Sequence, residues 1–170
     1  MKRELLISGT EISSKVKELG RRISLDYEGK EPLCIGILNG VVFFFADLVR
    51  AMTIPYSIDF IRAASYGSSM TSSGNLRLIK DVEIPIQGKD LIIVEDIVDT
   101  GHTLNRIVKN LRGRGPRSIN ICALIDKRER RKEEVPIDYC GFRVESGFLV
   151  GYGLDYNEQY RYLHDIYVLT

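Results

Sequence analysis

The chain has 170 residues, of which 44% are hydrophobic and 28% are charged, and these values are ordinary for a folded globular protein. Its 24 basic and 23 acidic residues give a formal net charge of +1, whereas a dedicated nucleic-acid-binding protein usually carries a clear basic excess. No stretch approaches the roughly 20 consecutive apolar residues of a membrane-spanning helix, so the composition argues against both nucleic-acid and membrane binding.

Apolar residues recur along the chain at spacings typical of helices and of buried strands. Ser8 and Glu11 form a capping-box pattern, and apolar residues at every third or fourth position continue a helix from there. Compact apolar runs between polar turns predict buried strands. In chain order, we expect a helix over 8–26, a strand over 32–38, a helix ending near Pro55, strands over 56–64, 76–82 and 90–98, a helix from about 100 to 112, a strand over 118–125, and short strand-like pieces at 137–144 and 148–154.

Strands alternate with helices through residues 33–125, and the strands are apolar on both faces. This pattern predicts an α/β fold with a mainly parallel central sheet flanked by helices. Because neither repeats nor a linker is present, we expect one domain over residues 1–170. The cysteines Cys34, Cys122 and Cys140 are far apart and lack zinc-binding spacing, so we expect buried, reduced thiols in a cytoplasmic protein.

Two polar segments interrupt the alternation. Residues 65–75, SYGSSMTSSGN, show no periodicity, and a loop of this length inside a compact domain is more often functional than accidental. We therefore expect a lid loop over about residues 65–76. Residues 126–134 are all charged, five basic and four acidic, which predicts a solvated turn, with an RNA-binding or partner-binding segment as the alternative.

The segment LIIVEDIVDTGHTL, residues 91–104, ends an apolar strand in three carboxylates. Open parallel sheets bind ligands beyond the carboxyl ends of their strands, and Glu95, Asp96 and Asp99 lie at such an end. Residues 100–104 then open a helix, whose first N–H groups are unpaired and carry the positive end of the helix dipole. Because Gly101 allows close approach, this turn predicts a phosphate-binding site.

The common nucleotide-binding patterns are absent from this turn, since neither GxxxxGK[ST] nor GxGxxG occurs in the chain. Carboxylates beside a phosphate would repel it unless they face hydroxyl groups, a proton to be moved or a bridging Mg²⁺. A ribose 5-phosphate meets these conditions, with its phosphate at the helix start and its hydroxyls at the carboxylates. The alternative is an acid-rich loop that only caps a helix.

The sequence VEDIVDTGHT resembles the phosphoribosyl pyrophosphate (PRPP) binding loop of type I phosphoribosyltransferases. Within that family it looks like the hypoxanthine-guanine branch, because it has a third acid at Asp99. Three further segments resemble the family in the expected order. ILNGVVFFFADL (37–48) looks like the pyrophosphate loop and its helix, SYGSS (65–69) like the start of the catalytic loop, and FLVGYGLDYNEQYR (148–161) like the purine- and metal-contacting segment. The resemblance extends over nearly the whole chain and implies a small hood formed by the termini.

The resemblance implies a role for each matching position. Asp99 is implied to lie near N7 of the purine as the general base or acid. PRPP binding is implied for Glu95, Asp96, Thr100, Gly101, His102, Thr103, Asn39 and Gly40. Purine binding is implied for Lys127, Phe148 and Leu149, and Mg²⁺ binding for Glu95, Asp96 and Asp155, with Arg161 near the pyrophosphate and Ser65 and Tyr66 on the lid.

The activity implied by the resemblance is purine salvage, in which PRPP and hypoxanthine or guanine give IMP or GMP and pyrophosphate. The family usually forms homodimers or homotetramers, and the peptide bond before its first-loop residue can be cis. The chain departs from the family at that residue, because Asn39 stands where Lys is common, which removes a positive charge near the leaving pyrophosphate. Two alternatives are a xanthine-preferring enzyme and a PRPP-binding regulator that binds RNA or DNA.

Overall fold

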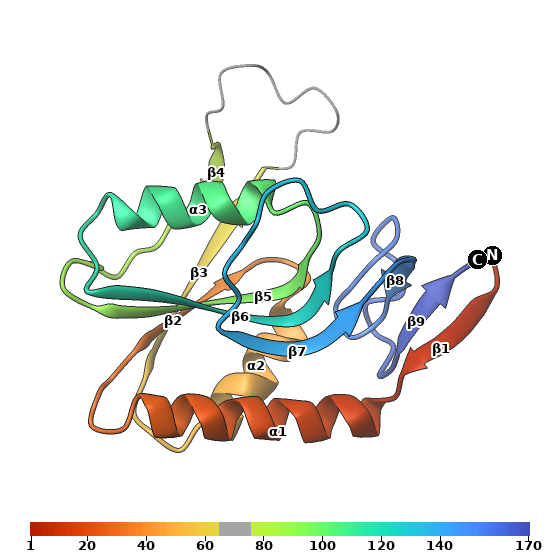
Figure 1. Ribbon diagram of the computed structural model, residues 1–170, viewed down its shortest axis with the longest axis horizontal. Coiled ribbons are helices and arrows are strands. Elements are labelled where there is room, and N and C mark those ends of the chain that lie inside the picture. The colour runs from red at the N-terminus through yellow and green to blue at the C-terminus, as the bar shows by residue number, and fades with distance from the viewer. Residues whose placement is uncertain (65–75) are drawn as a thin grey trace.

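The computed structural model describes residues 1–64 and 76–170, and it contains two sheets (Figure 1). The larger sheet has six strands in the order β4-β3-β2-β5-β6-β7. All neighbours in it are parallel except the pair β3 and β4, which confirms the predicted α/β fold with a mainly parallel sheet. Its strands are β2 (Leu33–Ile37), β3 (Ser57–Ala63), β4 (Leu78–Lys80), β5 (Asp90–Val98), β6 (Ser118–Lys127) and β7 (Tyr139–Val144).

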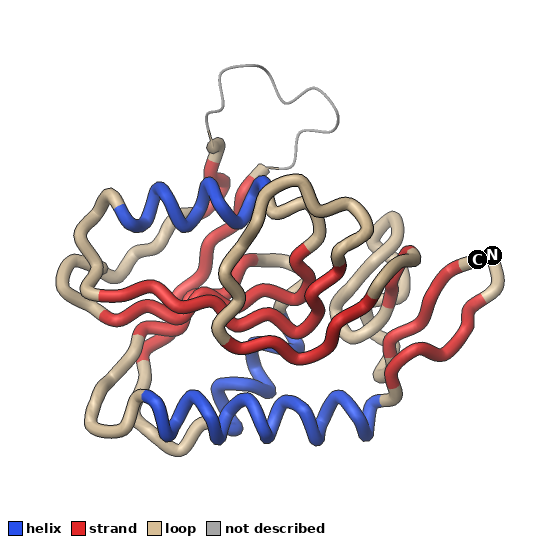
Figure 2. The backbone as a smooth tube through the Cα atoms, viewed as in Figure 1, coloured by secondary structure: helices blue, strands red, loops and turns tan. Residues whose placement is uncertain are grey.

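Helices cover both faces of this sheet (Figure 2). Helices α1 (Gly9–Asp26) and α2 (Val42–Ala51) pack on one face, and α3 (His102–Arg112) packs on the other. Side chains alternate between the two faces along β5, so that Ile92 and Val94 face α1 and α2 whereas Ile93 faces α3. This double coverage explains why the sequence of β5 is apolar at every position from 91 to 94.

The capping box at the start of α1 is formed as predicted. The Oγ of Ser8 accepts a hydrogen bond from the Glu11 amide at 3.2 Å, and a carboxylate oxygen of Glu11 accepts one from the Ser8 amide at 2.8 Å. These two bonds satisfy backbone donors that the first turn of the helix leaves free. The helix therefore begins and ends at the residues that its sequence indicates.

The termini form a second, three-stranded antiparallel sheet in the order β1-β9-β8, which confirms the expected hood. Its strands are β1 (Arg3–Ile7), β8 (Phe148–Val150) and β9 (Ile166–Leu169). In Figure 1 this sheet stands beyond the carboxyl ends of β6 and β7, where both chain ends also lie. The hood therefore borders the edge of the large sheet at which the predicted ligand site lies.

Three predictions about local structure need revision or restriction. Strand β4 is shorter than the predicted 76–82. The charged segment 126–134 is not simply a solvated turn, because Asp126 and Lys127 continue β6 and are only 2% and 6% exposed. They are held there by parallel pairing with β7, and ion pairs compensate their burial. The expected lid residues Ser65 and Tyr66 lie outside the described residues.

The cysteine prediction is confirmed for two of the three thiols. Cys34 and Cys122 are free and buried, and burial raises the pKa of Cys34 to about 12, which makes its thiol unreactive at neutral pH. Cys140 is also free, but it is partly exposed on the edge strand β7. No helix in residues 1–64 or 76–170 combines the length and the apolar character that crossing a membrane requires.

Candidate active site

A cavity of about 310 Å³ opens where β5 and β6 end and the hood begins. Segments that lie far apart in the sequence meet in its wall: the loop after β2, the end of β5, the end of β6, and the region from 148 to 161. Its lining residues are Asn39, Gly40, Asp96, Ile97, Asp99, Lys127, Arg130, Phe148, Leu149, Leu154, Asp155 and Arg161. The carboxyl edge of the sheet therefore gathers most of the residues that the sequence singled out.

Two adjacent carboxylates end β5 beside this cavity. Asp96 lines it and is 8% exposed, whereas Glu95 is not among the lining residues and accepts a hydrogen bond from the Asp96 amide at 3.2 Å. Burial raises the pKa of Glu95 well above its ordinary range, and the negative charge of Asp96 raises it further. Burial also raises the pKa of Asp96, while backbone hydrogen bonds and the charge of Arg161 lower it. Hydroxyl donors or a cation at this position would stabilise the charged forms of both groups.

The loop after β2 approaches Asp96 through its backbone. The Leu38–Asn39 peptide bond is cis, as the resemblance indicated. A Cβ atom on Gly40 would overlap the Asp96 carboxylate, so a larger residue at this position would force that carboxylate to move. Asn39 itself is exposed at the mouth of the cavity and brings no charge to it.

The candidate phosphate loop lies at the start of α3. Gly101 precedes the helix with a φ of 87°, and a Cβ atom there would overlap the carbonyl oxygen of Glu133. The Oγ1 of Thr100 accepts a hydrogen bond from the His102 amide at 3.3 Å. Thr100, Gly101, His102 and Thr103 do not line the 310 Å³ cavity but follow Asp99 directly along the chain. The first amides of α3 therefore lie next to the cavity rather than inside it.

The two oxygens of Asp99 have different surroundings. Its Oδ2 lies 3.4 Å from Nη1 of Arg130, whose side chain is 65% exposed. Its Oδ1 is buried and has no hydrogen-bond partner among the described residues. This carboxylate therefore has an acceptor oxygen that the protein itself does not satisfy.

A buried amino group and an exposed aromatic ring lie together in the wall of the cavity. The side chain of Lys127 is 7% exposed, and its Nζ lies 3.5 Å from a carboxylate oxygen of Glu129. Phe148 is 48% exposed, and its ring meets the ring of Tyr156 edge-on at a centroid distance of 5.5 Å. Leu149 is buried beside it. A flat heteroaromatic ring with a carbonyl group would complement this pairing of an aromatic face with an ammonium donor.

Arg161 joins the hood segment to the cavity. Its Nη2 lies 3.2 Å from Asp155 and 3.0 Å from Glu158, and its Nη1 donates to the carbonyl of Gly153 at 2.6 Å. Within the described ranges, no group of three or more His, Cys, Asp or Glu residues gathers in a way that could hold a metal ion. A cation would therefore need oxygen ligands from a substrate in addition to Asp96 or Asp155.

Sequence reasoning missed the basic residues of the loop after β6. Arg130 lines the cavity, and the side chain of Arg131 is only 5% exposed. The sequence carries a signal in the form of five basic residues between 127 and 132, but periodicity does not indicate which of them turn inward.

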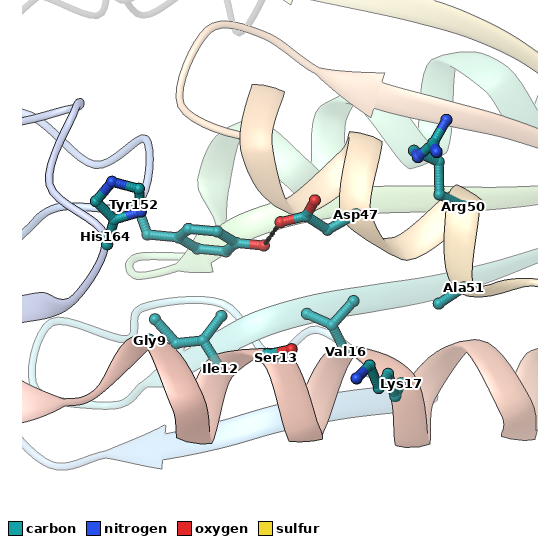
Figure 3. A pocket seen from close by; sticks show the side chains of 10 residues that line it. All are labelled: Gly9, Ile12, Ser13, Val16, Lys17, Asp47, Arg50, Ala51, Tyr152 and His164. Carbon is teal, nitrogen blue, oxygen red and sulfur yellow. Dashed lines mark hydrogen bonds between the residues drawn. The ribbon is translucent and has the colours of Figure 1, made fainter.

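A larger cavity, of about 460 Å³, lies between α1 and α2 (Figure 3). Figure 3 shows Tyr152 pointing toward Asp47 of α2, above Ile12 and Val16 of α1, and the Tyr152 hydroxyl donates to the Asp47 carboxylate at 2.6 Å. This cavity contains none of the predicted site residues. The predicted site residues therefore line the smaller cavity at the end of β5 and not this one.

Comparison with known proteins agrees with this placement. Residues 8–157 match the family described as the phosphoribosyl transferase domain. The chain belongs to the phosphoribosyltransferase family. This finding confirms the family that the resemblance of the PRPP loop indicated.

Relatives of this phosphoribosyltransferase cover almost its whole length. It is 45% identical to the hypoxanthine-guanine phosphoribosyltransferase of Bacillus subtilis over 98% of this chain and 92% of that protein. It is 43% identical to the hypoxanthine phosphoribosyltransferase of Salmonella typhimurium over 94% and 91% of the two chains. A crystal structure of a Bacillus anthracis hypoxanthine-guanine phosphoribosyltransferase superposes with a TM-score of 0.93 at 41% identity, covering 98% of each chain.

Proposed function

We propose that this phosphoribosyltransferase is a purine salvage enzyme that transfers the 5-phosphoribosyl group from PRPP to hypoxanthine or guanine. The products are IMP or GMP and pyrophosphate. The observation that carries the proposal is the single cavity in which Asp96, Asp99 and Lys127 meet the ring of Phe148. Relatives whose names state this activity and that are 41–45% identical over nearly the whole chain support it.

Asp99 is the proposed general base or acid. As a purine nitrogen bonds to the anomeric carbon, the purine loses a proton, and the bond to pyrophosphate breaks with its electron pair leaving on the phosphate oxygen. An acceptor oxygen without a protein partner suits the transfer or sharing of that proton. General acid–base assistance of this kind contributes about 10²–10⁴-fold to the rate.

Lys127, Phe148 and Leu149 are the proposed purine contacts. The buried Lys127 ammonium would donate to the 6-oxo group, and the exposed ring of Phe148 would stack on the base. The backbone of Leu149 would read the edge of the purine. A 6-amino purine would present a donor to Lys127 in place of an acceptor, which disfavours adenine.

Residues 100–103 are proposed to bind the 5-phosphate through backbone amides and hydroxyls, because the start of α3 concentrates donors there. Glu95 and Asp96 would hold the ribose hydroxyls. Asn39 and Gly40 would meet the pyrophosphate through their backbone, with Arg161 nearby. Residues 65–76, with Ser65 and Tyr66, remain the predicted lid.

Mg²⁺ is the proposed cofactor, and the residues fit a cation that PRPP brings with it. Mg²⁺ is usually bound by one or two carboxylates together with substrate phosphates, and Asp96 and Asp155 both face the cavity. The raised pKa values of Glu95 and Asp96 mark a site where a cation would relieve two buried carboxylates. When bound, Mg²⁺ neutralises charge on the leaving pyrophosphate. We assign it to Glu95, Asp96 and Asp155.

Assembly and location complete the proposal. A homodimer or homotetramer that pairs through α2 is supported by Val42 and Phe43, which are 43% and 44% exposed at the start of that helix. A cytoplasmic location is supported by three free cysteines.

The proposal is tested by pyrophosphate release with Mg²⁺ and PRPP, offering hypoxanthine, guanine, xanthine and adenine separately. Turnover with hypoxanthine or guanine and none with adenine is expected. Preferred turnover with xanthine would indicate the other base specificity, and PRPP binding without any turnover would indicate a regulator instead of an enzyme.

The role of Asp99 is tested with Asp99→Ala. We expect kcat to fall about 10²–10⁴-fold, while calorimetry finds PRPP binding within a few-fold of wild type, because the phosphate loop is left in place. Asp99→Glu keeps the carboxylate and should retain more activity than the alanine variant. Wild-type kcat in Asp99→Ala would remove this residue from the mechanism.

A further inference from the structure

The charged segment 126–134 wraps around the start of the phosphate loop. The amides of Lys132 and Glu133 both donate to the carbonyl of Thr100, at 2.9 and 3.1 Å. The Glu133 carboxylate pairs with the ring of His102 and accepts a hydrogen bond from the side chain of Asn105 at 3.1 Å. The segment is thus attached to the loop through both backbone and side chains.

Arg131 makes the deepest of these attachments. Its side chain is only 5% exposed, and its Nε donates to the carbonyl of Asp99 at 2.8 Å. Its Nη2 donates to the carbonyl of Val98 at 3.1 Å, to the carbonyl of Lys127 at 3.3 Å, and to the Asp126 carboxylate at 2.6 Å. One planar guanidinium therefore binds the last residues of both β5 and β6.

The buried carboxylate of Asp126 holds this guanidinium in place. Its side chain is 3% exposed and pairs with Arg131 on one oxygen and with the more exposed Arg128 on the other, at 3.1 Å. A buried ion pair loses hydration on both partners and seldom stabilises a fold more than apolar residues of the same volume would. The directional bonds of the Asp126–Arg131 pair are therefore better explained by a role in positioning neighbouring groups than by a role in stabilising the fold.

The position of these bonds matters because the sheet ladder ends here. Parallel pairing of β5 with β6 runs as far as Val98 and Asp126. Asp99 and Lys127, which are both proposed to act on the purine, lie one position beyond that last pair. Arg131 spans the two strand ends where the ladder no longer joins them.

We propose that Arg131, held by Asp126, is a positioning residue that sets the carboxylate of Asp99 relative to the ammonium of Lys127 during phosphoribosyl transfer. The inference rests on the proposed function and adds to it a residue that does not touch the substrate. It implies that substitution of Arg131 slows the chemical step and raises the KM for the purine. PRPP binding is largely spared, because Lys132 and Glu133 still hold the phosphate loop.

The test compares Arg131→Lys with Arg128→Ala. Lysine keeps the charge and can pair with Asp126, but its single nitrogen cannot replace a planar fork on several carbonyls. Since misplacement by about 1 Å can cost 10²-fold in rate, we expect kcat to fall about 10–100-fold and the purine KM to rise. The affinity for PRPP with Mg²⁺, measured by calorimetry, should stay within about threefold. Arg128→Ala removes an exposed partner of the same carboxylate and should keep the wild-type kcat.

A double variant separates positioning from folding. Asp126→Leu with Arg131→Met replaces the buried pair by apolar side chains of similar size, so the protein should remain folded with a melting temperature near that of wild type. We expect it to be as slow as Arg131→Lys. If the wild-type enzyme is active and either variant keeps the wild-type kcat and purine KM, the inference about Arg131 is wrong while the proposed function stands. A wild-type enzyme that turns over no purine would overturn the proposed function together with the inference.

Discussion

At the residue scale, Asn39 is a position at which the resemblance to the family leads us to expect Lys. It is exposed and uncharged, and it lines the cavity together with Gly40 and Arg161. The pyrophosphate that we propose to bind here carries several negative charges. Its binding then depends on backbone donors, Arg161 and Mg²⁺ rather than on a lysine at this position.

This dependence gives a prediction for Asn39→Lys. An added ammonium group near the pyrophosphate should lower the KM for PRPP and the inhibition constant of pyrophosphate by about three- to tenfold, consistent with a partly exposed charge pair of about 1 kcal/mol. Initial-rate kinetics with pyrophosphate as product inhibitor measure both constants. Asn39→Gln is the matched control and should resemble wild type. Equal constants in the lysine and glutamine variants would show that charge at position 39 is irrelevant.

Residues differ in how far the sequence alone could place them. Glu95, Asp96 and Asp99 were predictable as site residues, because three carboxylates at the end of an apolar strand have no packing function. The cavity places Asp96 and Asp99 together as that position requires. Arg131 was not predictable, because its burial depends on Asp126 and on carbonyls of a neighbouring strand. Local charge composition describes a solvated segment equally well, and only the tertiary structure separates Arg131 from the exposed Arg128.

At the scale of elements, the strand-to-helix turn at the start of α3 is the candidate phosphate site. Gly101 has a φ of 87° and lies directly under the carbonyl of Glu133, so the turn is packed as well as sharply bent. Apolar periodicity predicted the bounds of α1, β2, β3 and β5 to within one residue, whereas it overextended β4 and did not indicate β1 or β9. The extension of β6 through Lys127 did not follow from periodicity either, because pairing with β7 rather than hydrophobicity maintains it.

We predict that Gly101→Ala damages both stability and PRPP binding. The alanine Cβ would meet the Glu133 carbonyl in a left-handed backbone conformation, which should lower the free energy of unfolding by about 1–3 kcal/mol. PRPP affinity should fall at least tenfold because the amides of the loop shift. Gly113→Ala at the other end of α3 is the control, since φ there is −64° and its Cβ would make only ordinary contacts. Urea unfolding and calorimetry test both variants, and equal behaviour of the two would contradict the prediction.

At the scale of the whole molecule, the acidic residues at the two ends of the central sheet have different surroundings. The carboxyl end carries the buried acids of the candidate site, where burial raises the pKa values of Glu95 and Asp96. The amino end carries Asp90, which accepts hydrogen bonds from Arg117 at 3.0 Å and from Ser118 at 2.7 Å. These contacts join the first residue of β5 to the start of β6. Acids at the carboxyl end thus lie at the candidate site, whereas Asp90 at the amino end joins neighbouring strands.

This division predicts how stability depends on pH. Hydrogen bonds from Arg117 lower the pKa of Asp90 from an ordinary 3.8 to about 2 in the folded protein. The unfolded chain therefore binds a proton at this residue before the folded protein does, so the stabilisation is complete above about pH 5 and is lost as the pH falls toward 2. The shift corresponds to about 2 kcal/mol, which screening around the 63% exposed Arg117 reduces to about 1 kcal/mol.

The comparison of wild type with Asp90→Asn measures this contribution. The variant keeps an acceptor for Ser118 but loses the charge that pairs with Arg117. Urea unfolding should find it about 1 kcal/mol less stable at pH 7, and the difference should shrink as the pH falls, because wild-type Asp90 is then protonated as well. Purine turnover at pH 7 should be unchanged, since Asp90 lies at the opposite end of β5 from Asp99. A stability difference that stays constant from pH 7 to pH 2 would mean that Asp90 contributes through packing and not through its charge.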